Sequence, residues 1–437
     1  MEKDNYQSAL DYIYSFIDFS LTRNLRYSAA NFDLSRMQDL VDLLGNPERS
    51  YAVVHVAGTK GKGSTCALVA SILSAQGYKV GFYSSPHMID FKERIRVNDV
   101  QITSEEVVSL VESMRKKIEM VKGISTFEIT TALAFQYFSE KQVNIAVIEV
   151  GMGGRLDATN VVHPILTAIT SISLDHTMIL GDTIAKIAKE KAGIIKERIP
   201  VVIAKQSKEA KEVISDLARK ANSQIIDIEH DLDWKQVAYS LEKQSFQIEE
   251  KKLEESSQSP IYTMTLLGDH QLDNALTAYA VVKNLPPQYH VSEAAISAGF
   301  RKAHWTGRFE VISKSPMIII DGAHNPYSFE KLSQTIQKYL PGEKVTLIIG
   351  ASEDKDVPQM IEIISPFLEK IIYTRSDHPR AMSREDFLAI LTPQQLQEFC
   401  FEELESLITE IKSNTNEVYL AAGSIFIAGA VKQMLQN

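Results

Sequence analysis

The sequence reads Val54-His55-Val56-Ala57-Gly58-Thr59-Lys60-Gly61-Lys62-Gly63-Ser64-Thr65 at the place from which its architecture can be worked out. The apolar run 51–57 predicts a buried strand, and the apolar spacing of 65–76 predicts a helix. Glycines between them let main-chain N–H groups approach a polyphosphate, and the helix start adds partial positive charge. Lys62 supplies a cation. We therefore expect Gly58, Thr59, Lys60, Gly61, Lys62, Gly63, Ser64 and Thr65 to bind the phosphates of a nucleotide.

The spacing departs from the strict phosphate-loop pattern in two places. Val56 stands where the first glycine belongs, and Gly63 separates Lys62 from Ser64. A flexible glycine turn without a ligand is therefore the alternative. The strand before the turn and the helix after it favour phosphate binding.

The pattern around this stretch predicts an α/β protein. Further buried strands are expected at 144–150, 167–171 and 200–204, joined by helical crossovers such as 104–122. Short apolar strands with long helical connections are typical of a parallel sheet covered on both faces. The charged segment 229–259 is different, because polar and apolar residues alternate in it, and it is expected to form an antiparallel hairpin or small subdomain.

A second unit is expected after Arg308, where strand and helix patterns restart. Its strands are predicted at 317–320, 345–349, 371–374 and 418–421. The predicted fold class is thus α/β with two domains, an N-terminal P-loop NTPase-like parallel sheet and a smaller C-terminal Rossmann-like domain. We place the domains at 1–302 and 309–437, with an interdomain linker at 303–308.

Composition excludes several classes of function. The net charge of the 437 residues is −10, so a protein that coats nucleic acid or an anionic membrane is not expected. No run approaches the ~18 apolar residues of a membrane helix, and Met1–Tyr6 lacks the apolar core of a secretory signal. Cys66 and Cys400 form neither a disulfide framework nor a metal-binding pair. We therefore predict a soluble cytoplasmic protein.

A second glycine cluster, Glu149–Asp157, follows the strand expected at 144–150. It is not a dinucleotide fingerprint, because Leu156 stands where the last glycine is required. A carboxylate at the end of a buried strand is costly unless it is paired or bound to a metal. Glu149 is therefore read as a ligand of Mg²⁺ on the nucleotide, with a residue satisfied by main-chain amides as the alternative.

Other chemical groups also follow expected strands or stand at the linker. His176 in Ser173–His176 can bind or orient a metal, although a structural histidine is the alternative, and Lys191 by itself reads as a solvated charge. Asp321 and His324 precede an Asn-Pro dipeptide that also fits an ordinary turn. Arg308 at the linker can close over a phosphate, or can be a surface residue.

The order of these motifs resembles that of the folylpolyglutamate synthase/dihydrofolate synthase family, in the Mur ligase superfamily, over nearly the whole chain. The run Glu149–Asn160 is its most specific part. The resemblance implies a ligase that uses ATP and Mg²⁺, with two metal sites. It implies that the carboxylate of a folate or of dihydropteroate becomes an acyl phosphate, from which L-glutamate displaces phosphate. Whether one or both acceptors are used stays open, with dihydrofolate synthase activity favoured.

The resemblance also assigns roles to single residues. It implies that Lys62, Lys191, His176 and Arg308 take part in catalysis, and that Lys191 is carbamylated and so becomes an anionic oxygen donor. The loops around 28–36 and 125–130 are expected beside the pterin. The remaining roles are Mg²⁺ ligation by Ser85, Glu149, His176 and Lys191, an adenine-side contact by Asn274, nucleotide or phosphate contacts by Arg308, Asp321 and His324, and a pterin contact by Asp157.

Two positions depart from the family pattern. Lys60 stands where the family usually has asparagine, which adds a charge of unknown effect. Thr306 stands where the linker usually has proline, which frees the main chain there while Arg308 is kept.

Three other functions are weighed against this one. A Mur enzyme with a UDP-linked acceptor needs a UDP-binding domain before the phosphate loop, which begins by Gly58. An ATP-binding module or kinase does not require His176, Lys191 or the 321–325 motif. An inactive relative is expected to have lost Lys62, Glu149 or Lys191, and none is lost. We expect a monomer.

Overall fold

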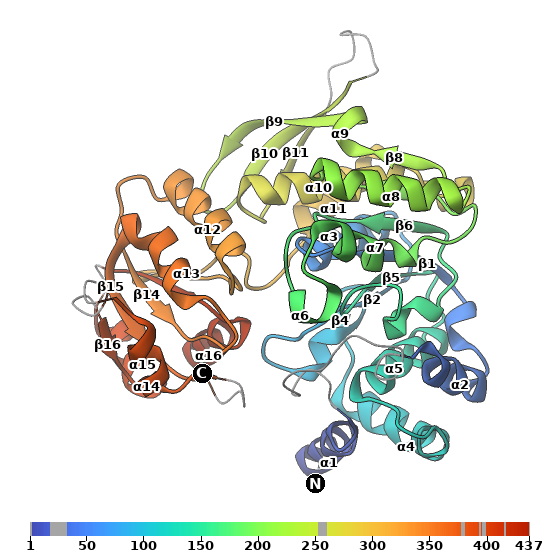
Figure 1. The fold of residues 1–437 in the computed structure, drawn as a ribbon, viewed down its shortest axis with the longest axis horizontal. Helices are drawn as coiled ribbons and strands as arrows, with labels where there is room; N and C mark the ends of the chain where they lie inside the picture. The colour runs from blue at the N-terminus through green and yellow to red at the C-terminus, as the bar shows by residue number, and fades with distance from the viewer. Residues whose placement is uncertain are drawn as a thin grey trace.

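The computed structural model describes residues 2–17, 33–251, 260–376, 381–392, 395, 399–414 and 417–436. The chain forms two bodies that lie side by side, with the C-terminal body in orange and red in Figure 1. Of the expected pterin-side loop 28–36, residues 28–32 lie outside the described residues. No helix in the described ranges is long and apolar enough to span a membrane.

The larger body is built on an eight-stranded sheet in the order β4-β3-β2-β5-β1-β6-β7-β8. The predicted parallel sheet is confirmed for the six strands from β2 to β8 in the sheet order, while β3 and β4 add an antiparallel edge on the other side. The strands are β1 (Ala52–Ala57), β2 (Val80–Tyr83), β3 (Ile95–Val97), β4 (Val100–Gln101), β5 (Ile145–Glu149), β6 (Leu166–Ile169), β7 (Val201–Ile203) and β8 (Ile225–Asp227).

Helices cover both faces of this sheet, as expected for buried parallel strands. Apolar side chains of β1 alternate between the two faces, so Val54 and Val56 pack with α3 while Val53 packs with α5. The helices of this body are α1 (Glu2–Tyr14), α2 (Leu34–Leu44), α3 (Lys62–Ala75), α4 (Ser104–Met120), α5 (Thr126–Glu140), α6 (Thr177–Leu180), α7 (Ile184–Lys191), α8 (Lys208–Lys220), α9 (Ile228–Asp231), α10 (Asp269–Lys283) and α11 (Glu293–Lys302).

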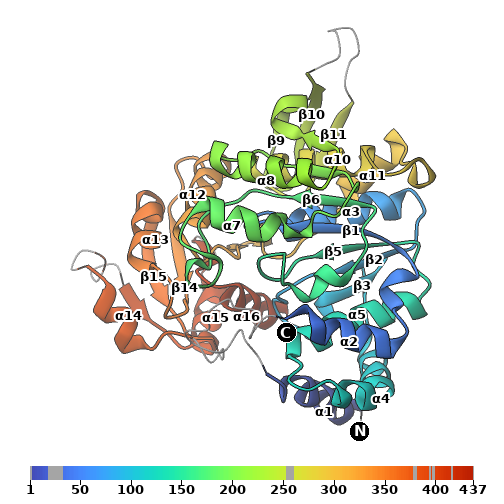
Figure 2. The same cartoon turned by 45° about the vertical axis from the view of Figure 1, so that its right-hand side comes forward.

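A small antiparallel sheet confirms the hairpin expected at 229–259. It consists of β9 (Leu232–Tyr239), β10 (Gln244–Glu250) and a third strand, β11 (Ile261–Met264). Figure 2 shows it above α10 and α11. Phe246 and Tyr262 point from it into the core that α3 shares with Phe300 of α11. The hairpin is thus part of the larger body's core.

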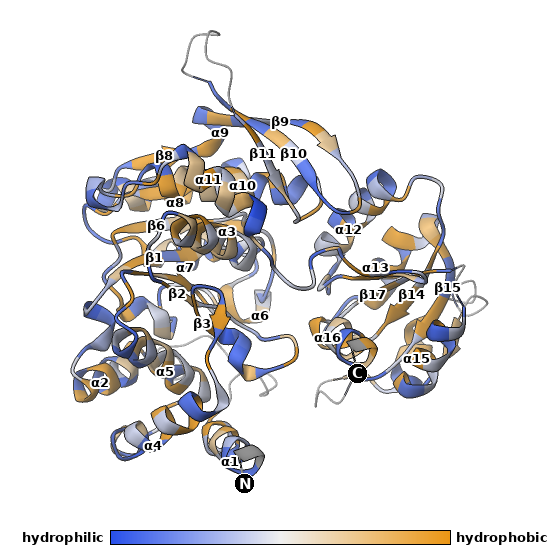
Figure 3. Cartoon of the chain, turned by 180° about the vertical axis from the view of Figure 1, so that it is seen from behind, coloured by the Kyte–Doolittle hydropathy of each residue, from blue (hydrophilic) through white to orange (hydrophobic). Residues whose placement is uncertain are grey.

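The smaller body is a six-stranded sheet in the order β12-β13-β17-β14-β15-β16, parallel except for β12. Its apolar strands lie in the middle of the body, as the colouring by hydropathy shows (Figure 3). The elements are β12 (Glu310–Lys314), β13 (Met317–Ile320), β14 (Val345–Ile349), β15 (Leu368–Tyr373), β16 (Phe399–Phe401), β17 (Val418–Ala422), α12 (Pro326–Tyr339), α13 (Val357–Ile364), α14 (Arg384–Ile390), α15 (Leu404–Ser413) and α16 (Ile425–Gln436).

The first helix after the glycine turn starts earlier than predicted. It was expected over 65–76, but α3 begins at Lys62, because Gly61 adopts a left-handed conformation with φ of 84° and turns the chain into the helix. Lys62 is therefore a residue of the first helical turn, and it does not lie in the preceding loop.

Candidate active site

The turn after β1 forms a strand–loop–helix unit whose helix start is open to an anion. Gly61, the N-cap of α3, offers no side-chain oxygen to the first N–H groups of the helix. Among the described residues, Lys62 forms no hydrogen bond or ion pair. Free N–H groups and a free ammonium at one helix start are what a polyphosphate requires. The binding of a polyphosphate by residues 58–65 stays a prediction.

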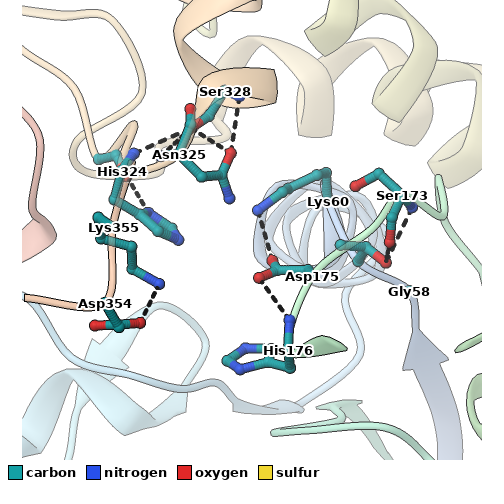
Figure 4. Close-up of polar contacts among 12 residues, drawn as sticks. Gly58, Lys60, Ser173, Asp175, His176, His324, Asn325, Ser328, Asp354 and Lys355 are labelled. Carbon is teal, nitrogen blue, oxygen red and sulfur yellow. Dashed lines mark hydrogen bonds and ion pairs between the residues drawn. The ribbon is translucent and has the colours of Figure 1, made fainter. Parts of the chain in front are cut away.

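The same turn is bound to the loop that follows β6. The main-chain N–H groups of Thr59 and Lys60 both donate to the Ser171 carbonyl, at 2.9 and 3.1 Å. The Thr59 hydroxyl donates to the Ser173 carbonyl at 3.2 Å, and the Lys60 ammonium lies 2.8 Å from an Asp175 carboxylate oxygen (Figure 4). The two loops therefore form one unit.

In this arrangement, the ammonium of Lys60 is paired with a carboxylate of the protein itself. The side chains of Lys60 and Asp175 are 20% and 15% exposed. Burial raises the pKa of Asp175, but the nearby Lys60 and His176 outweigh it and hold the pKa well below its usual range. Burial also lowers the pKa of Lys60, against the attraction of Asp175. In the structure, Lys60 joins the loop that follows β1 to the loop that follows β6. A contact between Lys60 and phosphate stays a prediction.

Glu149 and Ser85 lie together, as predicted. Glu149 ends β5, is 5% exposed, and accepts a long hydrogen bond of 3.4 Å from the Ser85 main-chain N–H. Burial raises the pKa of Glu149 to about 6, although Lys62, the Ser85 N–H and Arg308 lower it in part. One cavity is lined by Gly63, Ser85, Glu149 and Arg308.

Lys191 is buried, so its alternative reading as a solvated charge is wrong. It ends α7 at 4% exposure, and its ammonium donates to the Gly58 carbonyl at 2.8 Å. Burial, with Lys62 nearby, lowers the pKa of Lys191 to about 7. Lys191, the last residue of α7, thus contacts the phosphate loop that follows β1.

His176 lies at the edge of the larger body, facing the smaller one (Figure 4). It has a left-handed φ of 49° and stands immediately before α6. From the opposite side, His324 and Lys355 point toward the same space. His324 donates from Nδ1 to the Gly322 carbonyl at 2.7 Å, which leaves Nε2 for another partner.

The linker brings Arg308 to this region. Phe309, the next residue, is anchored in the core of the smaller body, and its N–H donates to Asp321 at 2.7 Å. The other Asp321 oxygen accepts from the Ala323 N–H at 2.7 Å, so this carboxylate organises the turn that carries His324. The Asn-Pro alternative is correct in part, because Asn325 caps α12 and Pro326 begins it.

Asn274 and Asp157 are engaged with protein groups. A Cβ at Gly61 would lie 2.2 Å from the Asn274 side-chain oxygen, so Asn274 packs directly on the phosphate loop. Asp157 is 5% exposed and accepts from the Met152 N–H and the Thr159 hydroxyl. Their contacts with adenine and pterin stay predictions.

Trp305 and Lys355 at the site were not predicted, whereas Phe127 lies in the loop 125–130 that was expected beside the pterin. The Trp305 indole packs on Gly63, where a Cβ would lie 2.9 Å from the ring, and Phe127 similarly covers Gly151. Lys355 pairs with Asp354 at 2.9 Å and points toward the space between His324 and His176. The only local signal for Lys355 is the polar turn after an apolar strand, while nothing local marks Trp305 as a neighbour of residue 63.

Comparisons with known proteins agree with this geometry. Residues 56–282 match the family model of the Mur ligase middle domain, and residues 307–425 match that of the Mur ligase glutamate ligase domain. The chain is 36% identical to the dihydrofolate synthase/folylpolyglutamate synthase of Bacillus subtilis and 33% identical to the folylpolyglutamate synthase of Lacticaseibacillus casei, each over 99% of both chains. A crystal structure of the Mycobacterium tuberculosis folylpolyglutamate synthase complexed with ADP and AMPPCP superposes with a TM-score of 0.85, at 27% identity, over 100% of this chain and 99% of that one.

Proposed function

We propose a mechanism for this chain from the premise that it belongs to the Mur ligase family, as a folylpolyglutamate synthase/dihydrofolate synthase. It is an ATP-dependent ligase that adds L-glutamate to folates. The observation that carries the mechanism is Lys62 at the start of α3, which has no partner among the described residues and lies beside a cavity lined by Glu149 and Arg308. These groups surround the place where a phosphoryl group would be transferred.

The reaction has two steps. A carboxylate oxygen of the folate attacks the γ-phosphorus of ATP, the bond to ADP breaks, and an acyl phosphate forms. The free amine of L-glutamate then attacks the acyl carbon, phosphate leaves, and an amide results. Lys62 and the N–H groups at the helix start hold the transferring phosphoryl group, because its negative charge is otherwise repelled by the attacking carboxylate.

The donor groups fit Mg²⁺ bound together with a nucleotide. Glu149 and the Ser85 hydroxyl are oxygen donors, and Glu149 is a buried carboxylate that forms no ion pair with any residue that the structure describes. No group of three His, Cys, Asp or Glu side chains in the described part of the chain could hold a metal by itself. Mg²⁺ is usually held by one or two carboxylates together with phosphate oxygens, so this sparse set is suitable. When bound, Mg²⁺ would supply charge neutralisation at the phosphates.

Lys191 and His176 would hold a second Mg²⁺ only after Lys191 is modified. As an ammonium, Lys191 donates to Gly58 and cannot be a metal ligand. Carbamylation changes this, because the Nζ lone pair attacks CO₂, an N–C bond forms and the nitrogen loses a proton. The resulting carbamate is anionic and retains one N–H for the Gly58 carbonyl. Burial favours the neutral amine that this step requires.

The smaller body would complete the site by closing. Arg308 ends the linker, and Asp321 and His324 follow β13 in the smaller body, so their distance from the phosphate loop changes with domain orientation. Arg308 already lines the cavity with Glu149, and closure would complete its contact with the phosphates and exclude water from the acyl phosphate. The domain bounds 1–302, 303–308 and 309–437, a monomeric state and a cytoplasmic location remain predictions.

Dihydropteroate is proposed as a second acceptor. It carries a free carboxylate, as a folate does, and the Bacillus subtilis relative bears both names. The test is ADP release from ATP, Mg²⁺ and L-glutamate, with dihydropteroate, with tetrahydrofolate and with neither. Release with both acceptors supports the full proposal, and release with tetrahydrofolate alone removes the second activity. If neither acceptor leads to ADP release, the proposal is contradicted. A UDP-linked acceptor or an inactive protein then becomes the next hypothesis.

The carbamate has a separate test. Protein equilibrated with ¹³C-bicarbonate is expected to show one carbamate carbon resonance that is absent from Lys191→Ala. Lys189→Ala is the matched control, because this lysine lies on the same helix and is not buried. A resonance that persists in Lys191→Ala would contradict the assignment.

A further inference from the structure

A chain of buried hydrogen bonds joins β1 to the loop that follows β5. His55 lies in the middle of β1 with no exposed surface, and its Nε2 is 2.9 Å from the Thr159 hydroxyl oxygen. That oxygen lies 2.5 Å from Oδ1 of Asp157, which also accepts the Thr159 N–H at 3.0 Å. Oδ2 of Asp157 accepts from the Met152 N–H at 2.8 Å. The strand that leads to the phosphate loop is thereby connected to the loop 150–160.

The direction of these bonds can be assigned from the number of protons. An ionised Asp157 only accepts, so the single Thr159 hydroxyl proton must point to Asp157. The Thr159 oxygen is then an acceptor toward His55, and His55 must carry its proton on Nε2. Burial lowers the pKa of His55 to about 3, so the ring is neutral and Nδ1 bears a lone pair. Nδ1 has no hydrogen-bond partner among the described residues, in agreement with this assignment.

We propose that His55 is a positioning residue for the acceptor substrate. By donating to Thr159, it fixes the hydroxyl rotation that holds Oδ1 of Asp157, while the Met152 N–H holds Oδ2. One lone pair of Oδ2 remains for a donor of the pterin, which is common to folates and dihydropteroate. This inference rests on the proposed function and on the expected contact between Asp157 and the pterin.

The alternative explanation is that His55 serves only to stabilise the core. A buried imidazole with an unpartnered nitrogen is a poor choice for that purpose, because an unsatisfied polar atom costs free energy. The residues on either side of His55 in β1, Val54 and Val56, are apolar and buried. A structural role also predicts equal effects on the KM values of both substrates, whereas the side-chain hydrogen bonds of His55 lead to Asp157, in the loop that is expected to contact the pterin.

The first test is Thr159→Val, which removes the hydroxyl and keeps the volume. The KM for tetrahydrofolate is expected to rise about tenfold, because a hydrogen bond to a charged group is lost, while the KM for ATP stays within about twofold. Thr167→Val is the matched control: this buried threonine lies beside His55 in the sheet, but its hydroxyl donates to the Pro200 carbonyl. Its KM values should equal those of the wild type.

The second test replaces His55 by two amides. Glutamine places an N–H near the position of Nε2, and asparagine places it near that of Nδ1. His55→Gln is therefore expected to keep the wild-type KM for tetrahydrofolate, and His55→Asn to raise it as Thr159→Val does. Equal KM values for His55→Gln and His55→Asn, or a parallel rise in the KM for ATP, would overturn the proposal.

The tautomer gives a readout that does not depend on turnover. Nitrogen-15 NMR of histidine-labelled wild-type protein, with the resonance assigned by its loss in His55→Gln, should show the proton on Nε2. A proton on Nδ1 would overturn the proposal. Wild-type protein that releases no ADP with any folate would instead contradict the proposed function, so the two failures can be told apart.

Discussion

Two glycine-rich loops lie next to each other in this molecule, one after β1 and one after the neighbouring strand β5. Their compositions are similar, yet they do different things. The loop 58–61 opens into the fourteen-residue helix α3, with no side chain capping the helix start. The loop 151–157 opens only into a short 3-10 helix, Ala158–Val161, which Asp157 caps.

The difference lies in how the polar groups are used. In the first loop, the start of α3 and Lys62 are left for a ligand, while the rest of the loop is tied to residues 171–175. In the second, the Met152 and Thr159 N–H groups are bound by Asp157, and Gly154 lies under the carbonyls of Lys191 and Glu190. A glycine loop therefore binds an anion only where the element that follows leaves its amides free.

The largest expected effect tests the first loop. Lys62→Ala should lower kcat for ADP release by about a thousandfold, because the only unpaired cation at the helix start among the described residues is lost. The comparison is with Lys60→Ala in the same loop, whose ammonium is already paired with Asp175 and whose loss should cost at least ten times less. Similar losses of kcat in Lys62→Ala and Lys60→Ala would contradict the different roles assigned to the two lysines.

The next effect tests whether the first loop needs the smaller body. Arg308→Ala should slow single-turnover chemistry by about a hundredfold and leave the affinity for tetrahydrofolate within about twofold, because its contact forms on closure. Arg301→Ala, an exposed arginine on α11, is the control. A collapse of folate affinity with normal single-turnover chemistry would show that the gating idea is wrong.

The second loop is tested by stability. Gly154→Ala would place a Cβ 2.7 Å from the Lys191 main-chain oxygen, so backbone must move, and the free energy of unfolding should fall by roughly 3 kcal/mol. Gly342→Ala has nothing within 4 Å but a φ of +83°, and should cost about 1 kcal/mol. Urea unfolding measures both. Equal losses in the free energy of unfolding would mean that the loop 151–157 can move to accommodate the Cβ and is not tightly packed.

A further effect on stability concerns Lys60. Lys60→Met leaves the largely buried Asp175 unpaired and should lower the free energy of unfolding by roughly 2 kcal/mol at pH 7. Since the pKa of Asp175 is lowered in the folded protein, this contribution is present above its ordinary pKa of about 3.9 and is lost as the pH falls below that value. Urea unfolding at several pH values checks both statements.

The control for Lys60→Met is Lys186→Met, which breaks an exposed pair with Asp182 and should change stability little. A loss in Lys60→Met that does not shrink at low pH would show that Asp175 is not the partner that matters.

Local patterns predicted most of the architecture. Apolar runs located β1, β5, β6, β7 and four strands of the smaller body, β13, β14, β15 and β17, because a buried strand in a parallel sheet is apolar along its whole length, while the edge strands β12 and β16 were not predicted. The start of α3 was missed by three residues, since the turn into the helix is made by the φ of Gly61 and not by an apolar period. The short strand β2 was not predicted, because four residues carry too little periodicity.

What the sequence by itself determined is therefore the order of strand, loop and helix, and the motifs that identify the family. Tertiary structure alone decided which polar groups meet: Lys60 with Asp175, 115 residues away, His55 with Thr159, 104 residues away, and Lys191 with Gly58, 133 residues away. The physical reason is that periodicity reports which face of an element is buried. Hydrogen bonds between distant residues depend instead on how the carboxyl ends of neighbouring strands are brought together at one edge of the sheet.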